Sequence, residues 1–152
     1  MVRLKPPSGM GQVYLDANAE ALRRGDRKVS TEHVLLALLI DPDSSTAQAL
    51  GVSLDAAREA LEGLDQDALA SMGVQATSAG PVLPGRERDR LPLTPAAKAA
   101  FTGLGKQAGR ERVGIHHVLL SLLSNQRPDP AAVLLDTLGA DRTAIRARFG
   151  KV

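Results

Sequence analysis

The sequence of 152 residues contains no cysteine and few aromatic residues. Without cysteine the chain can form no disulfide, no thiolate nucleophile and no zinc–thiolate site. Tyr14, Phe101 and Phe149 are its only aromatic side chains. Hydrophobic residues still make up 43% of the chain, which is enough for a core. That core must be built from Leu, Val and Ala, which favours closely packed helices over a sandwich or a barrel.

Neither sign of charge dominates the sequence. The 19 Lys and Arg residues nearly balance the 17 Asp and Glu residues, and the net charge is +2. A protein that binds a nucleic-acid duplex usually gathers basic residues on one face, whereas the densest basic cluster here, at residues 86–90, is interrupted by acidic residues. We therefore expect no nucleic-acid partner. The alternative is a small helical nucleic-acid-binding regulator, which would use the basic linker and Arg142, Arg146, Arg148 and Lys151.

Apolar runs long enough to cross a membrane are also lacking, so we expect no membrane partner. Residues 1–11 are followed by no apolar segment, which predicts that the chain has no secretion signal and is cytoplasmic. The last expected helix ends close to the C-terminus, and from this we expect a complete small protein.

A leucine-rich sequence of seven residues occurs twice, at residues 33–39 and again 84 positions later at residues 117–123. The two copies differ only where Ala37 is replaced by Ser121. Such a run is too short for a membrane span and too rich in leucine for a typical strand. Each copy is therefore predicted to form a helix that is buried on most sides.

The match between the two copies extends well beyond these helices. Gly25 aligns with Gly109, and residues 50–53 align with residues 138–141 once the offset grows from 84 to 88. We therefore predict an all-α fold of eight principal helices, built as a tandem, pseudo-two-fold repeat of a four-helix unit. The expected boundaries within a single domain, residues 1–152, are residues 12–64 for repeat one, 65–92 for an extra turn and a linker, and 93–150 for repeat two.

Local signals mark where several helices should begin. Ser30 or Thr31 should cap the first leucine-rich helix, because their hydroxyl groups can accept the free amide hydrogens of the first turn. Residues 65–72 should form a separate turn or two of helix, with Asp65 or Asp67 as its cap. Further expected caps are Ser53, Thr94, Asp129 and Asp141, two of which precede a proline at the first helical position.

The histidines do not form a recognisable metal site. His33 and His117 are equivalent by the repeat and so lie in separate halves, and His116 adds a third imidazole beside one of them. With no cysteine and no pair of histidines four residues apart, a zinc site is not expected. We predict instead that Thr31, His33 and His117 are structural and orient the starts of the two buried helices. No Gly-x-Ser-x-Gly motif is present, and we expect neither an enzyme nor a cofactor.

Residues 31–39, with the sequence TEHVLLALL, resemble the leucine-rich helix of the Clp N-terminal (Clp R) repeat domain. Residues 93–98 are similar to the entry to the second repeat of that family, and residues 50–52 and 138–140 match its usual start of a fourth helix. The resemblance covers about residues 13–149 and is strongest to ClpC-type N-domains. No Gly-x-x-x-x-Gly-Lys-Ser/Thr loop occurs, so we expect no AAA+ ATPase module in this chain.

The resemblance implies a docking module of a Clp-type unfoldase or protease system that binds substrate proteins, adaptors or peptides. The module could be a free-standing adaptor, decoy or sensor, or a severed receptor domain, and a ClpC-type ATPase is one implied partner. In ClpC relatives the domain also receives phosphorylated arginine. There a glutamate pairs with the guanidinium group, while a threonine and basic groups at a helix start hold the phosphate.

Each implied phosphoarginine site is only half present in this sequence. Repeat one keeps Glu32 but has Met10 at the position of the threonine. Repeat two keeps Thr94 and Lys98, but His116 replaces the glutamate. The candidate binding residues implied by the resemblance are therefore Glu32, Thr94, Lys98 and His116. The alternative for Glu32 is a first-turn charge that stabilises its helix.

Overall fold

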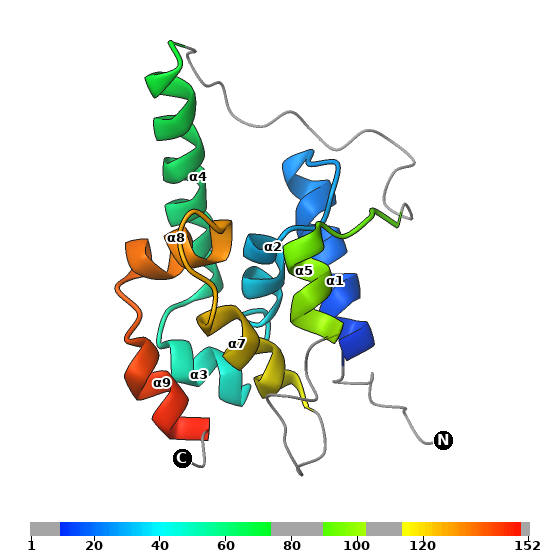
Figure 1. Cartoon of the computed structure of the whole chain (residues 1–152), viewed down its shortest axis with the longest axis vertical. Helices are drawn as coiled ribbons and strands as arrows, with labels where there is room; N and C mark the ends of the chain where they lie inside the picture. Colours follow the sequence, from blue (N-terminus) through cyan, green and yellow to red (C-terminus); the bar gives the residue numbers. More distant parts are fainter. Residues whose placement is uncertain (1–9, 74–89, 103–113, 150–152) are drawn as a thin grey trace.

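The protein is a bundle of short helices (Figure 1). The computed structural model describes residues 10–73, 90–102 and 114–149. The first set of helices in these ranges is α1 (Met10–Arg24), α2 (Thr31–Ala37), α3 (Ser45–Leu50) and α4 (Leu54–Ser71). The second set is α5 (Pro95–Thr102), α7 (Ile115–Leu123), α8 (Pro130–Leu138) and α9 (Arg142–Phe149). In these ranges the only β-type pairing is an isolated bridge between Val29 and Leu93, so the all-α prediction is confirmed.

The two sets of helices pack against each other in matching pairs. Helix α2 packs on α8, and its counterpart α7 packs on α3. In the same way α4 packs on α8 while α9 packs on α3, and α1 contacts α7 while α5 contacts α2. Each of these contacts thus has an equivalent contact in which the helices of the first set are replaced by those of the second, and the reverse. This is the pattern expected of a pseudo-two-fold repeat, and the predicted fold class is confirmed; the residue boundaries of the repeats stay a prediction.

The two leucine-rich helices lie at the centre of the molecule (Figure 1). Leu35 and Leu36 of α2, and Leu119 and Leu122 of α7, are completely buried. Burying one such side chain contributes about 2 kcal/mol, so these residues supply a large share of the driving force for folding. The repeats therefore shield each other's leucines, as the sequence predicted. No helix in the described part of the chain is long and apolar enough to cross a bilayer, and the cytoplasmic location stays a prediction.

The predicted caps account for four of the eight helix starts in the described part of the chain. Backbone N–H groups of the first turn donate to four of the predicted side chains, namely Ser53, Thr94, Asp129 and Asp141. Helices α3 and α8 also end alike, because Gly51 and Gly139 follow them with left-handed φ values of 71° and 73°. Glycine adopts this conformation without the strain that a Cβ atom would cause. The same local signals thus start and stop equivalent helices in both repeats.

One predicted helix boundary is wrong. Residues 65–71 do not form a separate turn, because α4 continues through them to Ser71. Asp65 is therefore inside the helix and does not cap one; its carboxylate instead pairs with Arg24 of α1. Gly73 follows the end of α4 with a φ of 80°. The helix continues because nothing between Leu64 and Asp65 interrupts its hydrogen bonding, and Figure 1 shows its last turns extending beyond the neighbouring helices.

The end of the predicted linker is held against the first repeat. Residues 74–89 lie outside the described residues, but Leu91 is buried, and its N–H donates to Asn18 Oδ1 of α1 at 2.8 Å. The Tyr14 hydroxyl donates to the Leu91 carbonyl at 2.9 Å. Val29 donates to the Pro92 carbonyl. These contacts bring the entry of the second repeat beside α1.

Candidate functional site

The start of α2 brings together Thr31, Glu32 and His33. The side chains of Thr31 and His33 point into the protein, and these residues are 0% and 1% exposed. Thr31 forms hydrogen bonds with the first residues of α8, the helix that follows Asp129. The N-terminus of α2, from the first repeat, therefore faces the N-terminus of α8, from the second.

Glu32 lies in the first turn of α2, and one of its carboxylate oxygens is unsatisfied. Oε1 is buried and accepts no hydrogen bond from any residue that the structure describes. Leaving a buried acceptor unpaired costs about 1–3 kcal/mol, and more when the group is charged. The attraction of a first-turn carboxylate to the helix dipole is smaller, about 0.3–1 kcal/mol. Glu32 is thus poorly explained by helix stabilisation alone, because Oε1 has no partner among the described residues.

His33 and His117 make the same contact at the starts of α2 and α7. His33 Nδ1 accepts the N–H of Ser30 at 2.9 Å, and His117 Nδ1 accepts the N–H of Gly114 at 2.8 Å. Glutamate or glutamine usually fills this role in a capping box, three residues after the cap. Because Nδ1 of His33 acts as an acceptor, its proton lies on Nε2, which donates to Asp26 Oδ2 at 2.7 Å.

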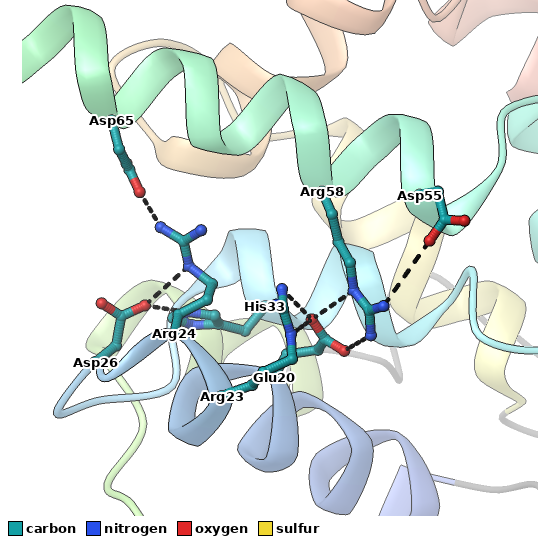
Figure 2. A network of polar contacts seen from close by, with 8 residues as sticks. All are labelled: Glu20, Arg23, Arg24, Asp26, His33, Asp55, Arg58 and Asp65. Atoms are coloured by element: carbon teal, nitrogen blue, oxygen red, sulfur yellow. Dashed lines mark hydrogen bonds and ion pairs between the residues drawn. The ribbon is translucent and has the colours of Figure 1, made fainter. Parts of the chain in front are cut away.

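Asp26 joins the start of α2 to the end of α1 (Figure 2). Its Oδ2 also accepts a hydrogen bond from Arg24 Nε at 3.2 Å, and Arg24 pairs in turn with Asp65 of α4. Burial alone would raise the pKa of the Asp26 carboxyl, but the hydrogen bond from His33, together with Arg24, outweighs burial and lowers the pKa. Asp26 therefore stays ionised and holds His33 in place.

A second polar contact joins α1 to α4 through a buried carboxylate (Figure 2). Glu20 is only 3% exposed and is contacted by Arg58 of α4 and Arg23 of α1. The hydrogen bond to Glu20 raises the pKa of Arg58 despite its partial burial. A buried carboxylate without such partners would be strongly destabilising, so the Arg58 side chain of α4 is needed to balance Glu20 of α1.

The predicted residues of the second repeat occupy α5 and α7, which pack on each other. The Thr94 hydroxyl accepts the N–H of Ala97 at 3.2 Å and so caps α5. Lys98 is exposed on the same helix, one turn further along. His116 contacts the His117 ring at 3.9 Å between centroids and stacks on Phe149 at 5.4 Å. His116 therefore packs against α9, while Thr94 and Lys98 lie on α5.

Comparison with known proteins identifies the family. The family model of the Clp repeat (R) N-terminal domain matches residues 8–138. The chain belongs to this Clp N-domain family. It is 30% identical over 143 residues to the chloroplastic chaperone protein ClpC of Pisum sativum. The matched region covers 90% of this chain but only 14% of that protein. This Clp N-domain thus spans a small part of the length of that relative.

A solved structure shares the fold of this Clp N-domain. The crystal structure of the N-terminal domain of the caseinolytic protease associated chaperone ClpD from Arabidopsis thaliana matches with a TM-score of 0.62. The match covers 91% of this chain and 93% of the other, at 22% sequence identity. At this identity the similarity shows the fold alone. The resemblance to the Clp N-terminal repeat that the sequence indicated is nevertheless confirmed by the family match.

The polar network around the Clp N-domain's α1 was not found from the sequence. Glu20 and Arg58 are 38 positions apart, and Asp26 and Arg24 read as ordinary surface charges. One signal was available, because Glu20 lies between Ala17 and Ala21 on the buried side of α1. A carboxylate within such an apolar stripe requires a cationic partner. Within the described residues no group of three potential ligands could hold a metal ion.

Proposed function

We propose that this Clp N-domain is a protein-interaction module of a Clp-type unfoldase or protease system. It binds substrate proteins, adaptors or peptides and has no ATPase activity of its own. The observation that carries the proposal is the match of residues 8–138 to the Clp N-domain family. The sequence contains no phosphate-binding loop of the Gly-x-x-x-x-Gly-Lys-Ser/Thr type, which agrees with the proposed lack of ATPase activity.

We further propose that Glu32 receives a guanidinium group of the bound polypeptide. Its buried, unsatisfied oxygen supports this role, because a carboxylate and a guanidinium form strong paired hydrogen bonds. In the second repeat Thr94, Lys98 and His116 form the complementary half of a phosphoarginine-like site. Thr94 and Lys98 lie at the N-terminus of α5, where the helix dipole favours a negative group. The half site of repeat one would then prefer the guanidinium group of phosphoarginine, and the half site of repeat two would prefer its phosphate group.

Peptide binding to the whole chain tests this proposal. We expect peptides that contain arginine or phosphoarginine to bind, and a matched lysine peptide to bind more weakly. Glu32→Gln keeps the shape of the side chain and should weaken binding of the arginine peptide about tenfold, since hydrogen bonds to charged groups contribute about 1.5–3 kcal/mol. Glu59→Gln is the control, because Glu59 is exposed on α4. If neither peptide binds, or if both variants bind like the parent chain, Glu32 has no such role.

The wider partner is identified by capture on the immobilised chain. Recovery of a ClpC-type ATPase would favour an adaptor or decoy, whereas recovery of proteolytic substrates alone would favour a receptor. Recovery of nucleic acid alone would contradict the proposed function. The family match gives no support to the nucleic-acid alternative, and the basic C-terminal segment is interrupted because Asp136 pairs with Arg142. We therefore propose a protein partner only.

A further inference from the structure

Beside the end of α7 the surface is hollowed by a cavity of about 460 Å³. Its walls come from the loop after α7, from α8 and from α9. Three arginines line it, Arg127 from the loop and Arg142 and Arg146 from α9. Asp136 of α8 is its only acidic lining residue. Three positive charges against one negative charge leave the lining of this arginine pocket with an excess of two positive charges.

Asp136 holds two of the three guanidinium groups in fixed positions. Arg127 Nε donates to Oδ2 and Arg142 Nη1 donates to Oδ1, both at 2.8 Å. These hydrogen bonds lower the pKa of Asp136, so its carboxylate stays ionised at neutral pH. Arg142 Nη2 also donates to the Ala132 carbonyl at 3.3 Å. A guanidinium has five N–H donors, and therefore both arginines keep donors for a ligand.

Arg142 also has a donor that is buried and unused. Its Nε finds no hydrogen-bond partner among the residues that the structure describes. Such a group is costly to leave unpaired.

The positive charge of Arg146 is also not neutralised by a carboxylate among the described residues. In the repeat alignment Arg146 corresponds to Arg58, whose charge is neutralised by the buried Glu20. The position equivalent to Glu20 in repeat two is Leu104, which carries no charge. Among the described residues Arg146 has no carboxylate partner, and its side chain is exposed at the pocket. Repeat two has thus kept the arginine without the acid that balances it in repeat one.

The equivalent place in repeat one is lined mainly by apolar residues, with Asp55 as its charged lining residue. There a cavity of about 260 Å³ is lined by Leu39, Ile40 and Leu54, among others, and by no lysine or arginine. Leu54 is the residue that the alignment places at Arg142. The hollow is therefore a property of the repeated fold, whereas the basic lining is specific to repeat two.

We propose that the arginine pocket binds an oxyanion, a carboxylate or a phosphate group, carried by a polypeptide. Planar guanidinium groups match the paired oxygens of both anions. The volume lies within the range of sites that accept side-chain-sized or small ligands. The choice of a polypeptide as the carrier rests on the proposed function; the preference for an oxyanion rests on the pocket alone. Glu32 is not among the residues that line this pocket, and its proposed site would have the opposite charge preference.

Titration of the ¹⁵N-labelled whole chain, followed by NMR, tests this inference. The probes are a glutamate-containing peptide, its phosphoserine and glutamine counterparts, and inorganic phosphate. We expect both anionic peptides to shift the backbone amides of residues 124–127 and 142–146, and the glutamine peptide to leave them unchanged. The tighter of the two anionic peptides identifies the preferred oxyanion.

A matched pair of variants separates a built site from general attraction to positive charge. Arg146→Gln should weaken binding of the anionic peptides about tenfold, because it removes one charge-assisted contact. Arg148→Gln removes the same charge from the same helix outside the pocket and should change binding less than about twofold, as screened surface charges contribute little.

Three results would overturn the inference. These are no shift at these amides with either anionic peptide, an equal loss of binding in both variants, or binding of inorganic phosphate without binding of the peptides. Arginine peptides report separately on Glu32, and Arg146→Gln should not weaken their binding. If only the acidic peptides bind, the arginine pocket is supported and the guanidinium role of Glu32 fails.

Discussion

The hydroxyl of Thr31 lies 3.0 Å from both carboxylate oxygens of Asp129, a residue 98 positions further along the chain. Thr31 begins α2 in the first repeat, and Asp129 caps α8 in the second. Thr31 Oγ1 also accepts the N–H of Ala131 at 3.1 Å. One buried hydroxyl thus joins the N-termini of two helices from different repeats.

Thr31→Val removes this hydroxyl while nearly keeping the shape of the side chain. We expect the free energy of unfolding to fall by about 1–3 kcal/mol, since a buried hydrogen-bond network loses its central member. Urea denaturation measures the change. Thr137→Val is the control, because that hydroxyl is exposed and bonds only within its own helix, and it should cost less than about 0.5 kcal/mol. Equal losses in the two variants would contradict a special role for Thr31.

The contact between Glu20 and Arg58 predicts a non-additive pair of substitutions. Arg58→Met alone should cost about 2–3 kcal/mol, less than a fully buried pair, because Arg58 is partly exposed and Arg23 remains near Glu20. The double variant that combines Arg58→Met with Glu20→Leu should be at least about 1 kcal/mol more stable than Arg58→Met alone, since no buried charge is then left unpaired. Repeat two already has leucine at this position, Leu104.

The unfolding free energies of both single variants and the double variant complete a double-mutant cycle. If the loss of unfolding free energy in the double variant equals the sum of the losses in the two single variants, the interaction between Glu20 and Arg58 does not stabilise the protein.

Asp26 predicts how stability changes with pH. Its pKa in the folded protein is below the ordinary value of 3.8, because His33 and Arg24 outweigh the effect of burial. A lowered pKa stabilises the folded state above the unfolded-state value, and this stability is lost as the pH falls through the folded pKa. We expect unfolding free energies to decline as the pH is lowered from about 5.

Asp26→Asn should make the chain less stable at neutral pH and should flatten this decline. Asp43→Asn changes the same group at an exposed position and should leave the decline as it is in the parent chain. Denaturation at a series of pH values gives both curves. A parallel decline in Asp26→Asn and in the parent would assign the acid sensitivity to other groups.

Glu32→Gln distinguishes the two roles that the sequence left open for Glu32. If the carboxylate serves to bind a cation, Oε1 has no partner in the free chain, and the unfolding free energy of the variant should stay the same or rise by about 1 kcal/mol. If the carboxylate serves as a first-turn charge, the unfolding free energy should fall by about 0.3–1 kcal/mol. Thermal or urea denaturation at neutral pH, with Glu59→Gln as the control, separates the two.

The helices could be predicted because their signals are local. A cap such as Thr94 or Asp129 bonds to amides two or three residues away, so the sequence alone indicates the contact. Asp65 shows the limit of this approach. Its position suggested a cap, but the decisive partner is Arg24, 41 residues earlier, and only the tertiary arrangement of α1 and α4 brings the two side chains together.

The candidate site could be predicted only in part. The resemblance to the Clp repeat singled out Glu32, but nothing in its neighbours along the chain indicates that Oε1 is buried without a donor. In the same way His33 was expected to orient α2, while its partner Asp26 and the position of its proton follow from the folded contacts.

By itself the sequence determined that a four-helix unit occurs twice, where most of its helices begin, and that its leucines form the core, because these features depend on spacing and on hydrogen bonds within a few residues. Only the tertiary structure decided which charges are balanced. Arg58 meets Glu20 across two helices, whereas the equivalent Arg146 faces a cavity without such an acid. The pairing of charges depends on distances between helices that are far apart in the chain, and folding alone sets those distances.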